Sequence, residues 1–525
     1  MRVIDFFDQA AHENPDRTLV EEPGTGKAFS FAQGKEITEQ VARGLVALGN
    51  ERGDRVGVYT PNCAEALLTT FSLWRIGGVW VPLNPHNAVD STAAFAAEVE
   101  LRTLFVHSVY ADRIPALRAQ VPSLELVVVI DDPAEEIPDT ITLAALVTKG
   151  EGIMLEDWND AHGRLEDLCA LAPTGGTTGS SKPVMLTNAT WAVMMDLTSR
   201  HFPRVEVPRM LVSAPMTHAA GILACLLAGQ GATTVVLPGF NAAAVLDAME
   251  TEKITHTFMP PTALYDLVAA QRANPRDLST MELLWLAAAP VATHRLAEAV
   301  EVLGPWIGQS FGQAEAPGFI TWMTPENLSA AARAGDLDRL ASCGRPTWGT
   351  QVGIMDDDGN LLSTGETGEI VVRGRLVTPG YHNLPEKTAE VRQHGWHHTG
   401  DIGRIDDDGF VYILDRLKDM IISGGFNVYP SEVETAMMQL PGVAQCAVIG
   451  VPHDRWGEEV TAVVVPTLDS DRDADALIAA CKQAIGSVKS PKQVHFVDEL
   501  PLTPARKVDK KVIRAQFWQG HPRAI

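Results

Sequence analysis

The chain has 525 residues, of which 46% are hydrophobic and 21% are charged, and its formal net charge is -24. This length exceeds the roughly 250 to 300 residues at which a single hydrophobic core stops growing, so at least two domains are expected. The composition is too apolar for disorder, and the excess of acid argues against nucleic acids and anionic membranes as partners, so an anionic ligand needs a local basic site.

The cysteines and the apolar segments bear on where the protein resides. Six cysteines lie in apolar surroundings without a CxxC pair or metal-ligand spacing, which predicts buried thiols in a reducing cytoplasm. Acidic residues near the N-terminus argue against a secretory signal. The most apolar segment, 221–240, is interrupted by Gln230 and predicts a buried helix followed by a strand rather than a transmembrane segment. The cysteines are Cys63, Cys169, Cys225, Cys343, Cys446 and Cys481.

The first third of the chain alternates helix-like and strand-like segments. Apolar spacing predicts a helix over 38–48, and residues 55–59 predict a strand. Residues 62–65 resemble a capping box for a helix that ends near Gly77. Short apolar runs predict further strands at 79–83, 103–106 and 126–130. Strands that alternate with helices favour an α/β fold.

The stretch LAPTGGTTGSSKPVML, residues 171–186, has the composition of an anion-binding loop. A Walker A loop is excluded, because Ser181 precedes Lys182 and Pro183 follows it. Its glycines allow close backbone approach and its hydroxyls are hydrogen-bond donors, so a polyphosphate is the expected ligand. A solvated Gly/Ser-rich turn is the alternative. The loop residues are Thr174, Gly175, Gly176, Thr177, Thr178, Gly179, Ser180 and Ser181.

Later segments indicate a change in the type of secondary structure along the chain. Strands are expected at 210–213 and 233–237 and a helix at 242–252. From about Val352, short strands such as 369–373 and 410–414 predict a small β-rich unit.

A compact α+β piece is expected at the C-terminal end. Residues 431–434 predict a capping box, followed by strands at 445–450 and 460–466 and a helix at 474–485. The domains are therefore expected to span 1–417 and 418–525.

Eight further motifs follow the loop in order: PMTHAAG (215–221), AAAP (287–290), FGQAE (311–315), GRP (344–346), TGD (399–401), DRLKD (415–419), SGG (423–425) and PLTPARK (501–507). Together they resemble the signature of the adenylate-forming superfamily, which includes acyl-CoA synthetases, nonribosomal adenylation domains and luciferases. The resemblance covers nearly the whole chain. It implies an α/β fold with a large multi-sheet N-terminal domain, a β-rich subdomain and a small mobile C-terminal α+β domain, with a hinge at Lys418.

The resemblance assigns an ATP site. Glu315 would hold Mg²⁺, and Asp401 and Arg416 would hold the ribose hydroxyls. Taken alone, these residues would be ordinary surface charges, and Phe311 an ordinary core residue. The loop from Thr174 to Lys182 would bind the phosphates, with Thr177 among the catalytic residues. The adenine pocket would be formed by Ala288, Ala289, Pro290, Phe311, Gly312 and Gln313.

Two further residues are implied to act in catalysis. Lys507 would bridge the substrate carboxylate and the α-phosphate, because a fixed cation offsets the charge that builds up there. The neighbouring Lys510 and Lys511 allow a merely basic tail as the alternative. His218 resembles the aromatic gate of the carboxylate pocket. Ala219 stands where amino-acid-activating relatives carry an Asp, so an amino-acid substrate is disfavoured.

The acceptor site is implied at the C-terminal end. Gly424 and Gly425 would let a pantetheine arm pass the backbone, and Trp456 would stack on the adenine of CoA. Lys489 and Lys492 would meet its phosphates. Rotation about Lys418 would alternate a pose for adenylation with a pose for thioester formation.

The chain departs from the family pattern at several positions. Ala314 replaces the usual Thr, which removes one hydrogen bond to a charged group, typically about 1.5 to 3 kcal/mol. Arg506 replaces the usual Gly before the catalytic lysine, and Ala287 and Ala288 stand where glycines are frequent. These changes leave the essential charges in place, but they are expected to affect the turnover rate.

The expected function is an AMP-forming acid:CoA ligase for an apolar acyl or aryl acid, with ATP, Mg²⁺ and CoA as cofactor and co-substrates. An acyl- or aryl-AMP ligase that loads carrier-protein pantetheine is one alternative, and a non-catalytic protein on a ligase fold is another. The sequence allows a homodimer but does not determine the oligomeric state.

Overall fold

The computed structural model describes residues 1–155, 165–174, 181–453, 455–467, 472–502 and 508–518. These residues form two compact units. The first unit contains the described residues from Met1 to Gln351 together with Arg373–Arg392, and the second contains Val352–Val372 together with the described residues from Gln393 onward. The β-rich residues before Lys418 therefore group with the C-terminal residues, and the hinge expected at Lys418 stays a prediction.

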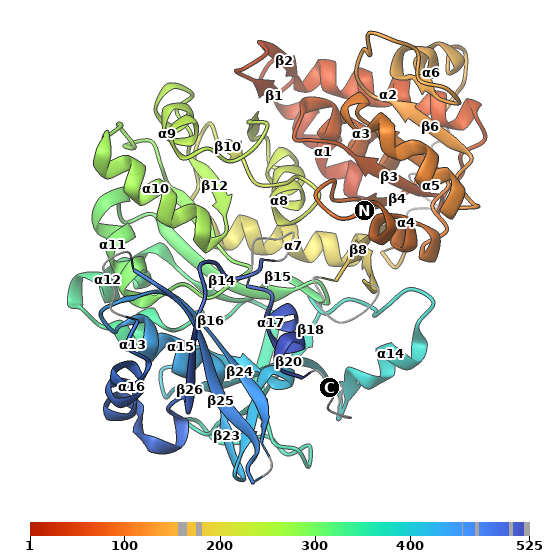
Figure 1. Cartoon of the computed structure of the whole chain (residues 1–525). Helices are drawn as coiled ribbons and strands as arrows, with labels where there is room; N and C mark the ends of the chain where they lie inside the picture. Colours follow the sequence, from red (N-terminus) through yellow and green to blue (C-terminus); the bar gives the residue numbers. More distant parts are fainter. Residues whose placement is uncertain (156–164, 175–180, 454, 468–471, 503–507, 519–525) are drawn as a thin grey trace. The chain divides into compact units, whose positions relative to one another are not determined.

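The first sheet of the N-terminal unit has the strand order β7-β6-β5-β3-β4-β8-β9 (Figure 1). Its strands are parallel except for the antiparallel pair β8 and β9. Every residue of β4, β5 and β6 except Leu126 is buried, as expected for parallel strands covered on both faces. The strands predicted here are confirmed. The bounds are β3 Arg55–Tyr59, β4 Val79–Pro82, β5 Thr103–Val106, β6 Leu126–Val129, β7 Ile141–Thr142, β8 Leu168–Pro173 and β9 Pro183–Thr187.

The second sheet of this unit has the order β16-β15-β14-β13-β12-β10-β11-β1-β2. Its strands from β14 to β1 pair in parallel, and antiparallel strands lie at both edges. The predicted strands at 210–213 and 233–237 are confirmed within one residue. The bounds are β1 Thr18–Glu22, β2 Lys27–Ser30, β10 Arg209–Val212, β11 Thr233–Val236, β12 His256–Met259, β13 Leu283–Leu286, β14 Ile307–Gln313, β15 Ala316–Met323 and β16 Arg345–Pro346.

Helices pack on both sheets, and Figure 1 shows α9 and α10 beside β10 and β12. The apolar segment 221–240 forms the buried helix α8 followed by β11, as predicted. Among the described residues, no helix has both the length and the apolar composition needed to span a bilayer. The bounds are α1 Val3–Glu13, α2 Phe31–Ala47, α3 Ala64–Arg75, α4 Val89–Glu98, α5 Ile114–Gln120, α6 Leu143–Lys149, α7 Asn188–His201, α8 Ala219–Ala228, α9 Ala242–Thr251, α10 Pro261–Ala273, α11 Thr293–Leu303, α12 Pro325–Ala334, α13 Leu337–Leu340 and α14 Pro385–Glu390.

The capping box predicted at 62–65 is wrong. Helix α3 begins at Ala64, and its first N–H donates to the carboxylate of Glu22 on β1, at 2.5 Å. The side chain of Asn62 instead contacts a distant segment: its Nδ2 donates to the Ala214 carbonyl at 3.0 Å, and its Oδ1 accepts from the Met216 N–H at 2.9 Å. Asn62 therefore holds the chain that leads into α8.

The cysteines, all of which lie in the described ranges, are free thiols. Cys446 is half-buried and the others are buried, in agreement with the sequence analysis. Burial raises the pKa of the Cys63 thiol to about 12, so this thiol stays protonated at neutral pH.

The second unit contains most of one sheet, β17-β18-β20-β19 with β21 beside β20, and a separate sheet, β23-β22-β25-β24 with β26 beside β25. The predicted strands at 369–373, 410–414, 445–450 and 460–466 are confirmed, and the last two are longer than expected. The bounds are β17 Thr350–Met355, β18 Gly368–Gly374, β19 Arg392–Gln393, β20 Trp396–Ile405, β21 Val411–Arg416, β22 Ile421–Ser423, β23 Phe426–Val428, β24 Val443–His453, β25 Gly457–Pro466, β26 Gln493–Phe496, α15 Pro430–Met438, α16 Ala474–Lys489 and α17 Lys510–Phe517.

The capping box predicted at 431–434 is also wrong, because α15 begins one residue earlier, at Pro430. The Ser431 N–H donates to the Asp415 carboxylate at 2.7 Å, and the Ser431 hydroxyl donates to the Leu414 carbonyl. A carboxylate from β21 therefore caps the helix from outside.

A test of packing in the first unit compares two glycines of α2. A Cβ on Gly44 would lie 2.3 Å from the carbonyl oxygen of Leu146 in α6, whereas a Cβ on Gly34 would meet a side-chain methyl of Leu19. Alanine normally stabilises a helix relative to glycine by about 1 kcal/mol. We expect Gly44→Ala instead to lower the free energy of unfolding by about 1 to 3 kcal/mol, because backbone cannot move aside as a methyl can.

Urea unfolding of the two variants, followed by circular dichroism, measures this difference. Gly34→Ala is the matched control and should lose less stability. A Gly44→Ala protein as stable as wild type would contradict the close approach of α2 and α6.

Candidate active site

The described ends of the glycine-rich loop lie at the end of the β8 and β9 hairpin. Pro173 and Pro183 are paired residues of these strands. Next to them, the Thr174 N–H donates to the Lys182 carbonyl at 3.1 Å, and the Lys182 N–H donates to the Thr174 hydroxyl at 3.1 Å. The Ser181 hydroxyl donates to the Thr174 carbonyl at 2.8 Å. The predicted phosphate-binding residues Gly175, Gly176, Thr177, Thr178 and Gly179 lie outside the described residues.

A segment much later in the chain, residues 380–382, pairs with β9 on the side away from β8. The Met185 N–H donates to the Gly380 carbonyl at 2.9 Å, and the His382 N–H donates to the Pro183 carbonyl at 2.8 Å. This pairing places the Tyr381 ring 4.7 Å from the ammonium of Lys182, within the range of a cation–π interaction. The sequence analysis missed Tyr381. The sequence feature that could have pointed to this residue is an aromatic side chain directly after the turn-forming pair Pro379-Gly380.

Glu315 occupies the turn between β14 and β15 and is half-buried. Its Oε1 accepts a hydrogen bond of 2.6 Å from the Tyr381 hydroxyl, and its backbone carbonyl accepts from the Thr378 N–H at 2.9 Å. Burial and the adjacent Glu315 both raise the pKa of Tyr381, so the tyrosine stays protonated and donates. Glu315 is therefore held by its side chain and by its backbone.

Arg392 supplies a cation near these residues. Its guanidinium donates to the Thr378 carbonyl. Burial lowers the pKa of Arg392, and the negative charge of Glu315 partly offsets that effect. The sequence analysis missed Arg392 as well, because no local pattern distinguishes it from a surface arginine.

The residues around Glu315 fit a magnesium ion that is shared with a nucleotide. Among the described residues, no group of three or more His, Cys, Asp or Glu side chains can hold a metal ion. Mg²⁺ in nucleotide sites commonly uses one or two carboxylates and takes its other ligands from phosphates and water. A single held carboxylate, with one oxygen left to bind, matches that donor set.

His218 precedes the first residue of α8 and is exposed. The Asn84 Oδ1 accepts from the His86 N–H at 2.9 Å, so the amide nitrogen of Asn84 faces His218 Nε2, at 3.1 Å. The turn into α8 requires glycine, since a Cβ on Gly221 would lie 1.7 Å from the Met216 carbonyl oxygen.

The predicted adenine pocket lies at one sheet edge. Ala288, Ala289 and Pro290 follow β13, and Phe311, Gly312 and Gln313 end the adjacent parallel strand β14. The carboxyl ends of parallel strands are where ligands bind in open α/β sheets. Ala288 has φ +77°, a conformation that glycine adopts without strain. Phe311 is 8% exposed, so both the adenine wall and core packing fit its position.

In the second unit the structure brings the two ribose candidates together. Arg416 Nε lies 2.7 Å from Asp401 Oδ1, and these residues are paired across β20 and β21. Glu369 supports the irregular part of β20 before Asp401, because its carboxylate accepts from the Gly400 N–H at 2.9 Å and lies 2.6 Å from His398 Nδ1.

Three of the CoA candidates also lie together. Gly424 and Gly425 form the tip of the β22 and β23 hairpin at positive φ, and the Gly424 N–H donates to the Trp456 carbonyl at 2.9 Å. The Trp456 ring stacks on His453, with 4.3 Å between ring centroids.

The predicted cations make internal contacts. Lys489 Nζ lies 2.7 Å from the Glu432 carboxylate, and Lys492 Nζ donates to the Ser490 carbonyl at 2.9 Å. Lys418 lies in the short 3₁₀ turn Leu417–Asp419, and burial lowers its pKa. Lys507, with Arg506, lies outside the described residues.

Comparison with known proteins identifies the family of the chain. Residues 7–382 match the model of the AMP-binding enzyme family, and residues 432–507 match that of the AMP-binding enzyme C-terminal domain. The chain belongs to the AMP-binding enzyme family.

Relatives that match nearly the whole chain indicate which reaction the protein catalyses. The medium/long-chain-fatty-acid–CoA ligase FadD8 of Mycobacterium tuberculosis is 37% identical over 499 residues, which is 93% of this chain and 85% of the relative. The feruloyl-CoA synthase of an Amycolatopsis species is 36% identical over 516 residues, which is 97% of both chains. The ATP-bound structure of MatB from Rhodopseudomonas palustris is 28% identical, with a TM-score of 0.86 over 99% of both chains. The protein is an AMP-forming acid:CoA ligase that uses ATP.

The Asp401–Arg416 pair generates a prediction about ATP binding. Asp401→Asn removes a charged acceptor of hydrogen bonds, each worth about 1.5 to 3 kcal/mol, so the KM for ATP should rise about 10- to 100-fold. The KM for the acid should stay near the wild-type value. Steady-state kinetics of pyrophosphate release measures both constants.

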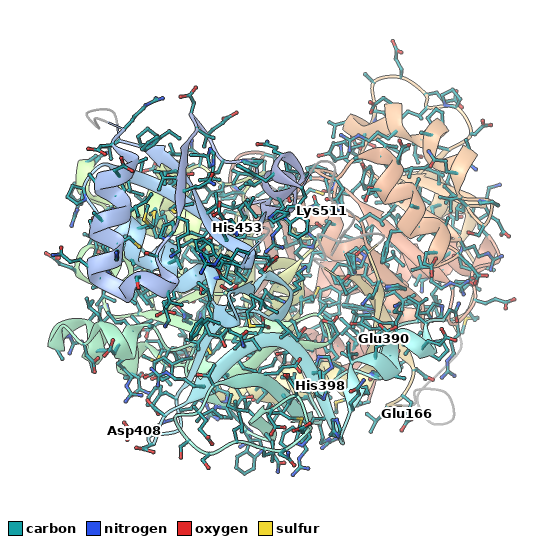
Figure 2. All side chains as sticks on the ribbon, turned by 60° about the horizontal axis from the view of Figure 1, so that its bottom comes forward. Glu166, Glu390, His398, Asp408, His453 and Lys511 are labelled. Atoms are coloured by element: carbon teal, nitrogen blue, oxygen red, sulfur yellow. The ribbon has the colours of Figure 1, made fainter. Side chains whose placement is uncertain are left out.

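Asp408→Asn is the matched control, because Asp408 is an exposed residue of the turn between β20 and β21 and points outward (Figure 2). A KM for ATP that stays unchanged in Asp401→Asn would exclude Asp401 from the ribose site.

Proposed function

We propose that the carboxylic acid substrate is an apolar acyl or aryl acid. The observation that supports this most directly is the start of α8. After His218 the chain continues with Ala219, Ala220 and Gly221, so this turn offers no carboxylate to pair with a substrate ammonium. The named substrates of the two relatives, a fatty acid and ferulic acid, fit the same class.

The reaction proceeds in two displacements. A carboxylate oxygen of the acid bonds to the α-phosphorus of ATP, and the bond to pyrophosphate breaks, which gives acyl-AMP. The sulfur of CoA then bonds to the acyl carbon, AMP leaves with the electron pair of its bond, and the thiol proton passes to solvent. We assign Lys507 to the first step, because it would offset the negative charge of two anions that meet there.

The remaining residues bind and orient the substrates. Glu315 would hold Mg²⁺, which when bound offsets phosphate charge. Lys182 would approach the same phosphates, Asp401 and Arg416 the ribose, and Ala288 and its neighbours the adenine. Ala314 between Gln313 and Glu315 contributes no hydroxyl, and a slower adenylation step is the consequence we expect.

We place the acceptor site at the Gly424 hairpin and Trp456. The two glycines leave room beside the backbone for a pantetheine arm, and the indole next to them offers a flat apolar surface to the CoA adenine. We further propose that residues 418–525 move about Lys418 between the two steps, that the protein resides in the cytoplasm, and that it forms a homodimer. Light scattering after gel filtration tests the last point.

Product analysis by mass spectrometry tests the proposed substrate. The protein is incubated with Mg-ATP and a panel of fatty, aryl, alicyclic and amino acids, with and without CoA. Acyl-CoA from an apolar class is the expected product. Activity confined to amino acids would overturn the substrate proposal, and acyl-AMP that accumulates despite CoA would favour loading of a carrier protein.

Lys507→Ala tests the assigned cation. We expect formation of acyl-AMP, followed by pyrophosphate release, to fall by about 100-fold or more, because electrostatic stabilisation of the first transition state is lost. Conversion of chemically prepared acyl-AMP to acyl-CoA should persist. Lys511→Ala is the matched control, since Lys511 is a nearby exposed lysine (labelled in Figure 2). Equal losses in both variants would contradict a specific role for Lys507.

A further inference from the structure

Tyr381 connects two groups that the proposed function assigns to the phosphates of ATP. Its hydroxyl donates to Glu315 Oε1 at 2.6 Å, and its ring lies 4.7 Å from the ammonium of Lys182. Glu315 comes from the turn after β14, Lys182 from the end of the glycine-rich loop, and Tyr381 from a third segment. One side chain therefore contacts both the carboxylate assigned to the metal and the cation of the loop.

The position of Tyr381 is tightly determined by backbone contacts. The Tyr381 N–H donates to the Thr388 hydroxyl at 3.0 Å, and the residue pairs with Val184 in an antiparallel bridge. Gly380 has φ +131°, and a Cβ there would lie 2.3 Å from a methyl of Thr388. The backbone of Tyr381 is thus held in place independently of the side-chain contacts with Glu315 and Lys182.

The hydrogen bond leaves half of the carboxylate available. Glu315 Oε1 accepts from Tyr381, and Oε2 has no hydrogen-bond partner among the residues that the structure describes. An ionised carboxylate has acceptor positions on both oxygens. A donor fixed on one oxygen orients the other, and such outer partners of metal ligands typically contribute 10- to 100-fold to metal affinity.

We infer that Tyr381 is a positioning residue for adenylation: its hydroxyl orients Glu315 toward the Mg²⁺ of Mg-ATP, and its ring holds Lys182 beside the phosphates. This inference rests on the proposed role of Glu315. Tyr381 itself touches no reacting atom, so its effect appears in metal-dependent binding of ATP rather than in binding of the acid.

Tyr381→Phe removes the hydroxyl and keeps the ring. The first readout is the affinity for ATP by isothermal titration calorimetry, with Mg²⁺ and with EDTA. We expect the gain in affinity that Mg²⁺ provides to fall about 10-fold relative to wild type, with the affinity in EDTA unchanged. The second readout is the Mg²⁺ concentration for half-maximal pyrophosphate release, which should rise by a similar factor while the KM for the acid stays constant.

Tyr412→Phe is the matched control, because the Tyr412 hydroxyl donates to the Asp406 carboxylate at 2.9 Å in the other unit. This variant loses the same kind of hydrogen bond and should behave as wild type. If Tyr381→Phe weakened ATP binding equally with Mg²⁺ and with EDTA, the role of Tyr381 would be structural and the inference would be wrong. An unchanged Mg²⁺ dependence would also overturn it.

Glu315→Gln separates the inference from the proposed function. If this variant keeps the wild-type Mg²⁺ dependence, the metal role of Glu315 fails, and the inference fails with it. If Glu315→Gln loses that dependence and Tyr381→Phe does not, only the inference fails. In the double variant, Tyr381→Phe should add no further loss of Mg²⁺ dependence, since both changes act on one contact.

Discussion

The backbone pairing along β9 is the interaction on which the candidate site depends. Strand β9 pairs with β8 on one side and with residues 380–382 on the other, so the described ends of the glycine-rich loop and Tyr381 lie at the same edge of the seven-stranded sheet. Interstrand hydrogen bonds define register to a single residue. Through Tyr381, that register carries over to Glu315 and thus to a turn of a different sheet.

Close backbone approaches explain why the motifs contain small residues. Gly221, in the first turn of α8, lies against the backbone of Met216. Gly312 lies against the backbone of Gly318, where a Cβ would be 2.5 Å from its nitrogen. At Ala288 the backbone conformation would suit a glycine, yet the residue is an alanine. Its left-handed conformation costs roughly 1 to 2 kcal/mol. Local strain of this kind is tolerated where surrounding packing compensates for it, and it is common at ligand sites.

Helix caps show where reasoning from local sequence was wrong. Both capping boxes matched the expected pattern, yet Glu22 from β1 caps α3 and Asp415 from β21 caps α15. A helix N-terminus needs an acceptor, and the fold supplies one from a distant strand as readily as from the next turn. Asn62 was then available to hold the segment that carries His218.

The sequence by itself determined the α/β class, most strand positions and the family, because apolar periodicity and the order of short motifs are local properties of the chain. It also predicted groups for the chemistry, such as Glu315, Asp401 and Arg416, and their roles stay predictions. Only the tertiary structure decided that Tyr381 contacts both Glu315 and Lys182. Tyr381 and Glu315 are 66 positions apart in the chain, and Lys182 belongs to a third segment. Contacts of that kind arise from strand pairing and packing, which no local pattern encodes.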